Sequence, residues 1–170
     1  MLYDQYRGFA CKIVFRYIYR YEKANDVVTD GFVKAFNHFE KFEAREVEDT
    51  EKILMGWLKR IMINCAIDEL RKNDLIPEIG GIPGDVWDVT NRNDNADQLL
   101  LYKELISLIK QMPPTYGVVF NLYIIDGYTH SQIAEMMQIP VNTSRSNLAR
   151  AKSFLQNAIK KMEEDKLCRI

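Results

Sequence analysis

Polar and cationic side chains gather between residues 141 and 152, a stretch that can form hydrogen bonds and bind anions. They are Asn142, Thr143, Ser144, Arg145, Ser146, Asn147, Arg150 and Lys152. Amides, hydroxyls and guanidinium groups donate and accept hydrogen bonds at base edges and phosphates. From Met136 to Met162 the chain has five cationic and no anionic side chains, although its net charge is -1. This local positive charge indicates contact with nucleic acid.

Two short helices joined by a tight turn must position these side chains. Gly127 is expected to end the preceding helix in a left-handed conformation, and Thr129 with Gln132 forms a capping box that opens the next one. Pro140 fits the start of a second helix rather than its interior. On this second helix we predict inward positions for Leu148, Ala151 and Leu155, and outward positions for Asn142, Ser144, Arg145, Ser146, Asn147 and Arg150. The pattern favours a helix-turn-helix, although an amphipathic hairpin with a solvated basic face has the same periodicity.

A second cationic helix is predicted over residues 56–72, GWLKRIMINCAIDELRK. Its polar side is expected to carry Lys59, Arg60, Asn64, Arg71 and Lys72, types that suit a DNA backbone with some base contact. The sequence before residue 60 is also rich in aromatic residues. Most of these rings are expected in the core, but exposed rings beside cations are typical of proteins that stack on unpaired bases.

Composition limits the classes of protein that this chain can belong to. Its 170 residues are 47% hydrophobic and 28% charged, as in a globular protein, and no run of about eighteen apolar residues indicates a membrane span. A cytoplasmic location is therefore expected. Cys11, Cys65 and Cys168 are far apart, and only His38 and His130 accompany them, which indicates neither a disulfide framework nor a metal site. We expect no cofactor, no small-molecule substrate and surface positions for both histidines.

The order of composition along the chain indicates two small helical domains. Between Asn73 and Asp97 three glycines and two prolines accompany six acids and the single base Arg92. Apolar spacing on either side is helical, without a convincing strand. We therefore predict an all-α chain with a helical domain at residues 1–73, an acidic flexible linker at 74–97 and a helix-turn-helix domain at 98–170. Within the last, helices are expected from about Gln98 to Gln111 and from Pro113-Pro114 through TYGVVFNLYIID.

Three segments in this order resemble the extracytoplasmic-function (ECF) class of bacterial sigma factors of RNA polymerase. They are NDVVTDGFVKAFNHFEKF at residues 25–42, GWLKRIMINCAIDELRK, and LIKQMPPTYGVVFNLYIIDGYTHSQIAEMMQIPVNTSRSNLARAK after the acidic stretch. The resemblance implies an initiation subunit that is not an enzyme and that binds core RNA polymerase and promoter DNA. It also implies an anti-sigma partner, which is often membrane-tethered.

The same resemblance assigns roles to the candidate residues. Docking on the polymerase clamp is implied for Asp26, Asp30, Phe32, Val33 and Phe36. Binding of the minus-ten element is implied for Lys59, Arg60, Asn64, Arg71 and Lys72. Reading of the minus-thirty-five element is implied for the polar residues of the second helix of the helix-turn-helix, listed above. The loop before the minus-ten helix would hold one flipped base, and the acidic linker would thread through the polymerase.

The chain departs from the family pattern in several places. The loop EAREVEDTEKILM after Phe42 is longer and more acidic than usual, and acids there would repel phosphate. Ser144 stands where the family commonly has an apolar residue, and Asn147 where it commonly has a basic one. The match begins inside the usual first domain, so a short leading helix is expected to be missing. Two alternatives remain. One is a helix-turn-helix regulator whose N-terminal domain senses a ligand or partner. The other is an enzyme that uses carboxylates such as Asp26 and Asp30, or Asp68 and Glu69.

Overall fold

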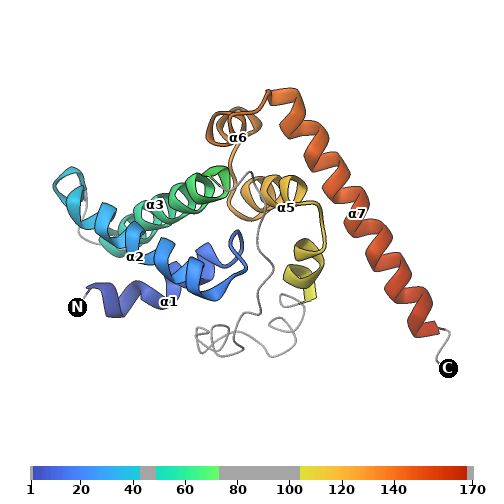
Figure 1. Cartoon of the computed structure of the whole chain (residues 1–170), viewed down its shortest axis with the longest axis horizontal. Helices are drawn as coiled ribbons and strands as arrows, with labels where there is room; N and C mark the ends of the chain where they lie inside the picture. Colours follow the sequence, from blue (N-terminus) through green and yellow to red (C-terminus); the bar gives the residue numbers. More distant parts are fainter. Residues whose placement is uncertain (1, 43–48, 73–103, 168–170) are drawn as a thin grey trace. The chain divides into compact units, whose positions relative to one another are not determined.

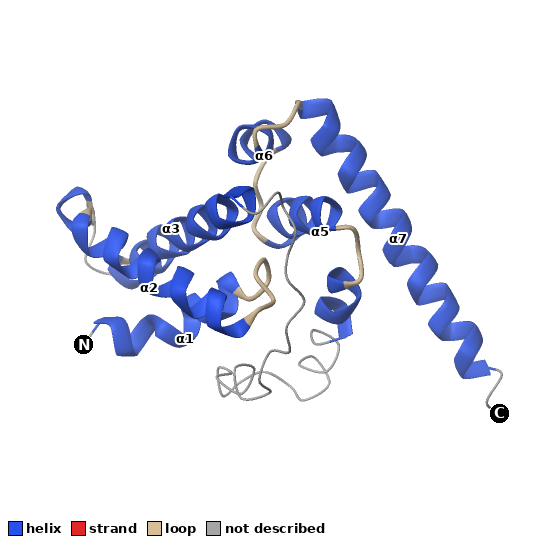
Figure 2. Ribbon diagram, in the orientation of Figure 1, coloured by secondary structure: helices blue, strands red, loops and turns tan. Residues whose placement is uncertain are grey.

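The structure, a computed structural model, describes residues 2–42, 49–72 and 104–167 (Figure 1). These residues form helices joined by short turns, and no strand occurs among them (Figure 2). The chain divides into two compact units, Met1–Asn91 and Arg92–Ile170. The predicted all-α, two-unit fold is therefore confirmed, whereas the predicted linker at 74–97 lies outside the described residues.

Three helices build the N-terminal unit, and each packs against the other two. They are α1 (Leu2–Val14), α2 (Tyr21–Asn37) and α3 (Thr50–Lys72), with a single 3-10 turn, η1 (Phe39–Lys41), after α2. On α2 the buried residues recur at three- and four-residue spacing, which places them on one side of the helix. Large side chains that are almost fully buried fill the core between the helices: Phe15, Tyr17, Phe32, Leu58, Met62, Ile63 and Ile67.

Gly31 of α2 faces the side chain of Met62 on α3. A Cβ atom at this position would lie 2.5 Å from the Sδ atom of Met62, which is itself fully buried. A glycine in a helix interior costs roughly 1 kcal/mol relative to alanine. Its presence here is explained by the buried Met62 side chain, which occupies the space that a larger residue would need.

Helix α3 begins earlier than the sequence indicated. Residues 43–55 were expected to form one loop, but α3 starts at Thr50, so that expectation is wrong for its last six residues. The backbone oxygen of Asp49 accepts a hydrogen bond from Ile53 N at 3.0 Å, and its carboxylate lies 3.0 Å from Lys52 Nζ. An acidic residue before the first turn is favourable because the helix dipole is positive at that end, so part of the acidic segment is compatible with a helix.

In the described part of the C-terminal unit, residues 104–110 are helical and α5 (Pro114–Phe120) follows them. The start of α5 at Pro114 was predicted from the two prolines. A π-helical turn, η3 (Asn121–Ile125), follows directly and leads to α6 (His130–Met137) and α7 (Val141–Leu167). Val119 and Leu122 are fully buried, but Tyr123 and Ile124 are 37% and 47% exposed. The middle helix therefore has an outer face at its end.

None of the described helices is both long enough and apolar enough to cross a lipid bilayer.

Candidate nucleic-acid interface

The segment that leads into α6 has the local chemistry that the sequence predicted. Thr129 N donates to Gln132 Oε1 at 2.9 Å, and Gln132 N donates to Thr129 Oγ1 at 3.3 Å, which completes the capping box. Gly127 has a φ of 78°, a left-handed conformation in which a residue without Cβ is not strained. Helix α6 ends at Gln138, whose φ of 55° is also left-handed, a feature the sequence did not indicate.

Apolar side chains from both helices close the core of the helix-turn-helix. Ile133 and Met137 on α6 are buried, as are Ala151 and Leu155 on α7. These helices pack on each other, and α7 packs on α5 as well. Since α7 is anchored on its inner side by α5 and α6, its other side is held in a fixed orientation toward solvent.

The solvent side of α7 carries most of the predicted DNA-binding residues. Exposed positions are occupied by Asn142, Arg145, Ser146, Arg150 and Lys152, and Thr143 is half-buried. Arg150 Nη1 donates to the hydroxyl of Tyr116 at 3.4 Å, and its guanidinium carbon lies 5.9 Å from the centre of that ring. Contact with α5 therefore orients Arg150. Arg145 instead lines a cavity together with residues at the start of α6.

Two of the predicted outward residues face inward. Ser144 is 0% exposed and Asn147 is 6% exposed, so the expectation that they face solvent is wrong. Ser144 precedes Leu148 by four residues and Ala151 by seven, which places it on the inner face of α7. Its polarity suggested an outer position, but its spacing along the helix decides its burial. A buried hydroxyl requires a hydrogen-bond partner, and His130 supplies one.

His130 is a site residue that the sequence analysis did not identify. It is the first residue of α6, it is half-buried, and its Nδ1 lies 3.0 Å from Ser144 Oγ. Its ring stacks on Tyr123 with centroids 4.5 Å apart. Burial lowers the pKa of His130 below its usual value, and the nearby cations Arg145 and Lys152 lower it further. The buried hydroxyl at Ser144 was the signal that could have indicated this partner.

An open cavity of about 500 Å³ adjoins this histidine. Its lining consists of Tyr123, Gly127, Tyr128, Thr129, His130, Ser131 and Arg145. The N-terminus of α6, where backbone N–H groups lack helical partners, contributes three of these residues. A guanidinium group, four hydroxyl-bearing residues and a helix N-terminus suit an anion such as a DNA phosphate.

The predicted cationic face of α3 is partly exposed and partly engaged in ion pairs. Arg60 and Asn64 are exposed, and Lys59 is half-buried. Arg71 and Lys72 are exposed as well, at the end of the helix.

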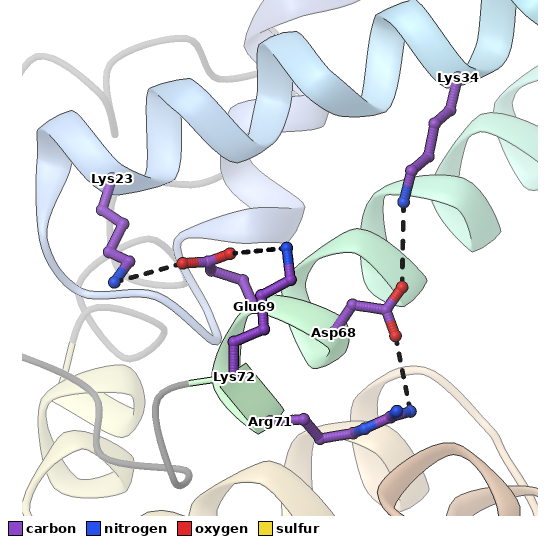
Figure 3. Close-up of polar contacts among 6 residues, drawn as sticks. All are labelled: Lys23, Lys34, Asp68, Glu69, Arg71 and Lys72. Carbon is purple, nitrogen blue, oxygen red and sulfur yellow. Dashed lines mark ion pairs between the residues drawn. The ribbon is translucent and has the colours of Figure 1, made fainter.

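Two carboxylates on α3, Asp68 and Glu69, each bridge a cation of α2 and a cation of α3 (Figure 3). Glu69 lies 3.2 Å from Lys23 Nζ and 3.8 Å from Lys72 Nζ. Asp68 lies 3.9 Å from Lys34 Nζ and 3.6 Å from Arg71 Nη1. Four cations and two carboxylates leave this cluster with two net positive charges. The cationic surface therefore extends onto α2, which the sequence analysis did not anticipate.

Aromatic rings border the other end of the α3 face. Phe42 lies 5.5 Å from Trp57 and 5.7 Å from Phe39, measured between ring centroids, and Phe39 lies 6.3 Å from Trp57. Phe39 is 45% exposed, so this cluster is not part of the closed core. Phe15 and Phe32 are core residues, as expected for most of the rings, whereas this second group reaches the surface. The loop predicted to hold a flipped base begins here, and its residues 43–48 lie outside the described residues.

The outer face of α2 combines acidic and apolar side chains. Asp26 and Asp30 are exposed one turn apart, and Val33 and Phe36 are 51% and 50% exposed. Phe32, predicted to lie with them, is 1% exposed and packs against Tyr3 at 4.8 Å. Phe32 is therefore a core residue and cannot belong to a docking surface. It lies four residues after buried Val28, a spacing that points it inward.

The cysteines have the environment of core residues. Cys11 and Cys65 are buried free thiols, and burial raises the pKa of each. Within the ranges that the structure describes, no three His, Cys, Asp or Glu side chains are grouped so as to hold a metal ion. Cys168 lies outside those ranges.

Comparison with known proteins assigns the two units to one family. Residues 2–76 match the family model of sigma-70 region 2, and residues 102–155 match that of sigma-70 region 4. The ECF RNA polymerase sigma-E factor of Haemophilus influenzae is 27% identical over 169 residues, which cover 94% of this chain and 86% of that protein. The ECF RNA polymerase sigma factor SigW of Bacillus subtilis is 25% identical over 167 residues, with 92% and 86% covered.

A solved structure has the same fold. The sigma factor RpoE, crystallised with the anti-sigma factor NepR from Bartonella quintana, superposes with a TM-score of 0.55 at 18% identity, over 89% of each chain. The region 2 match coincides with the unit built from α1, α2 and α3, and the region 4 match contains the helix-turn-helix. The chain belongs to the sigma-70 family and is an ECF-class RNA polymerase sigma factor.

Proposed function

We propose that this sigma factor directs RNA polymerase to promoters by binding two separate DNA elements, one with each unit. The observation that carries this proposal is the presence of a solvent-facing cationic helix in both units, α3 in the region 2 unit and α7 in the region 4 unit. A sensor domain has no need of a second cationic helix. The match of residues 2–76 to region 2 also favours this proposal over a regulator with an N-terminal sensor.

Helix α7 is proposed to read the minus-thirty-five element as duplex DNA. Asn142, Arg145 and Ser146 are exposed near its N-terminal end, the part of a recognition helix that enters the major groove. Arg150 and Lys152 lie farther along and suit phosphate contacts. The burial of Ser144 and Asn147 removes them from the proposed set.

Helix α3 is proposed to bind the minus-ten element through Lys59, Arg60, Asn64, Arg71 and Lys72. The aromatic cluster of Phe39, Phe42 and Trp57 is proposed to stack with unpaired bases, since a ring surface recognises any base by its flat face. In this arrangement the cations contact the DNA phosphates and the aromatic rings stack on the bases. Both contacts suit a DNA strand that has been separated from its complement.

The outer face of α2 is proposed to dock on core RNA polymerase. Asp26 and Asp30 offer charge complementarity to a basic partner, and Val33 and Phe36 offer apolar area that a partner can cover. We further propose that the chain has no catalytic activity of its own and requires no cofactor. It would act in the cytoplasm, where its polymerase and promoters are found.

An anti-sigma factor is proposed as the partner that holds this chain inactive. The support is the solved relative, a sigma factor captured with the anti-sigma factor NepR. Such a partner would need to cover the cationic or polymerase-binding faces named above. Affinity capture with the full chain from its native cells, with and without competing core polymerase, tests this expectation.

A binding experiment with holoenzyme tests the proposed function. Core polymerase reconstituted with this chain is mixed with promoter fragments in which the minus-ten element, the minus-thirty-five element or neither is scrambled. The proposal predicts that each scrambled element weakens binding, and that core polymerase alone does not distinguish the fragments. Equal binding of all three fragments by holoenzyme would contradict it.

A further inference from the structure

His130 lies where three elements of the helix-turn-helix meet. It opens α6, its Nδ1 lies 3.0 Å from the Oγ of fully buried Ser144 on α7, and its ring stacks on Tyr123 of η3. A hydroxyl can either donate or accept a hydrogen bond. A neutral Nδ1 can therefore accept from Ser144, and a protonated Nδ1 can donate to it. The contact with Ser144 holds the ring in place in both protonation states.

The cavity beside His130 is suited to an anion. Arg145 lines it from α7, and Thr129 and Ser131 line it from the start of α6. Because Nδ1 is hydrogen-bonded to Ser144, Nε2 is the ring nitrogen that can form a hydrogen bond with a group in the cavity. The positive end of the α6 dipole adds to the attraction for negative charge.

The charges around His130 oppose its protonation while the cavity holds no anion. From α7 these are Arg145 and Lys152, and from η3 the neighbouring ring is that of uncharged Tyr123. The nearest carboxylates in sequence are Asp126 at the end of η3 and Glu135 on α6. The pKa of His130 is nevertheless lowered, first by burial and then by the two cations. An anion in the cavity would reverse this balance.

We propose that duplex binding by the helix-turn-helix is linked to proton uptake at His130, because a DNA phosphate in the cavity supplies the anion that stabilises the charged imidazolium. This inference rests on the proposed role of α6 and α7 in binding duplex DNA. The imidazole is neutral in the free protein and protonated in the complex, and it is hydrogen-bonded to Ser144 in both states. Arg145 is the neighbouring cation that lines the same cavity.

The direction of the effect follows from linkage. The unbound protein favours neutral His130, and the complex favours the protonated form, so binding takes up a proton between the two pKa values. Affinity for duplex DNA therefore rises as the pH falls through that window. One proton taken up gives at most about a tenfold gain per pH unit, the limiting slope of a single site.

The test uses the full chain and a labelled mixed-sequence DNA duplex, since phosphate contacts do not depend on sequence. Fluorescence anisotropy is measured at constant salt between about pH 5.5 and pH 8, the range in which histidine titrates. We expect the wild-type affinity to rise several-fold to tenfold per pH unit on acidification. His130→Gln, which retains hydrogen-bonding capacity toward Ser144, should bind with little pH dependence.

The chain offers a matched control because it has only two histidines. His38 is exposed at the end of α2, in the other unit, and its Nδ1 lies 2.9 Å from the backbone oxygen of Lys34. His38→Gln should keep the full pH dependence. NMR titration of the His130 ring in the wild-type chain, with and without the duplex, reports the shift directly and does not depend on whether a variant folds.

Each outcome has a separate meaning. A wild-type affinity that does not change with pH, an unchanged slope in His130→Gln, or a His130 pKa that does not rise on DNA binding would overturn this inference and leave the proposed function standing. Absence of duplex binding at every pH would instead overturn the proposed DNA-binding role of the helix-turn-helix, and this inference with it.

Discussion

Neutralising Asp68 should strengthen single-stranded DNA binding, because this carboxylate holds Arg71 of the proposed minus-ten surface and Lys34, which extends that cationic surface onto α2. It lies 3.9 Å from Lys34 Nζ and 3.6 Å from Arg71 Nη1. DNA must compete with these pairs before a phosphate can take the carboxylate's place. An exposed ion pair contributes about 0.2 to 1 kcal/mol, so two pairs cost about 0.4 to 2 kcal/mol to release. Since about 1.4 kcal/mol corresponds to a tenfold change, Asp68→Asn should tighten binding by about 2- to 30-fold.

Anisotropy of the full chain with a labelled single strand measures this effect. A single strand offers the helix-turn-helix no duplex, so the readout reports chiefly on the region 2 unit. The slope of log K against log salt should steepen by about 0.7 for each additional phosphate contact that a released cation makes.

Glu22→Gln is the matched control for Asp68→Asn. Glu22 is also an acid with an ion pair, 3.7 Å from Arg20 Nη2, but its side chain is 83% exposed and lies at the start of α2. The same change in net charge there should alter binding by less than about twofold, since its single exposed pair is weak. If Asp68→Asn bound no more tightly than wild type, or if Glu22→Gln had an equal effect, the assignment of Lys34 and Arg71 to the DNA-binding surface would be refuted.

Three further predictions concern the other surfaces. Arg145→Ala should weaken duplex binding by about 1 to 3 kcal/mol if its guanidinium contacts a base, whereas Lys160→Ala should have a smaller effect; equal losses in a titration would argue against a special role for Arg145. Thr129→Ala removes the N-cap of α6 and should destabilise the C-terminal unit by about 0.5 to 2 kcal/mol in urea unfolding; unchanged stability would show that the cap contributes little. Phe36→Ala should weaken binding to core polymerase while unfolding like wild type, whereas Phe32→Ala should cost about 3 to 5 kcal/mol of stability because that ring is buried. If Phe36→Ala lost more stability than Phe32→Ala, the assignment of Phe36 to the surface and of Phe32 to the core would be wrong.

The sequence predicted the helix-turn-helix well because its signals are local. The capping box of Thr129 and Gln132 and the left-handed Gly127 are set by neighbouring residues, and the structure contains both. Residue type alone predicted less well which side chains face solvent. Ser144 and Phe32 occupy inward positions by their spacing, yet polarity suggested solvent for one and resemblance suggested a partner for the other.

Contacts between distant segments were outside the reach of the sequence analysis. His130 and Ser144 are 14 residues apart in the sequence, and Lys23 and Glu69, which form an ion pair, are 46 residues apart. Neither follows from a local periodicity, because each depends on how two helices cross. Packing of α2 against α3 brings the carboxylates of one helix to the lysines of the other, and only the fold reveals that part of the cationic surface is internally neutralised.

Run-off transcription tests the central claim most directly, because it requires polymerase binding, promoter recognition and strand opening together. Core RNA polymerase is combined with the full chain and a template that carries a promoter from the native genome. The account predicts a transcript of defined length that is absent with core polymerase alone and is reduced by Arg145→Ala and by Phe36→Ala. A chain that binds core polymerase and the promoter fragment but yields no specific transcript on any native template would contradict the account.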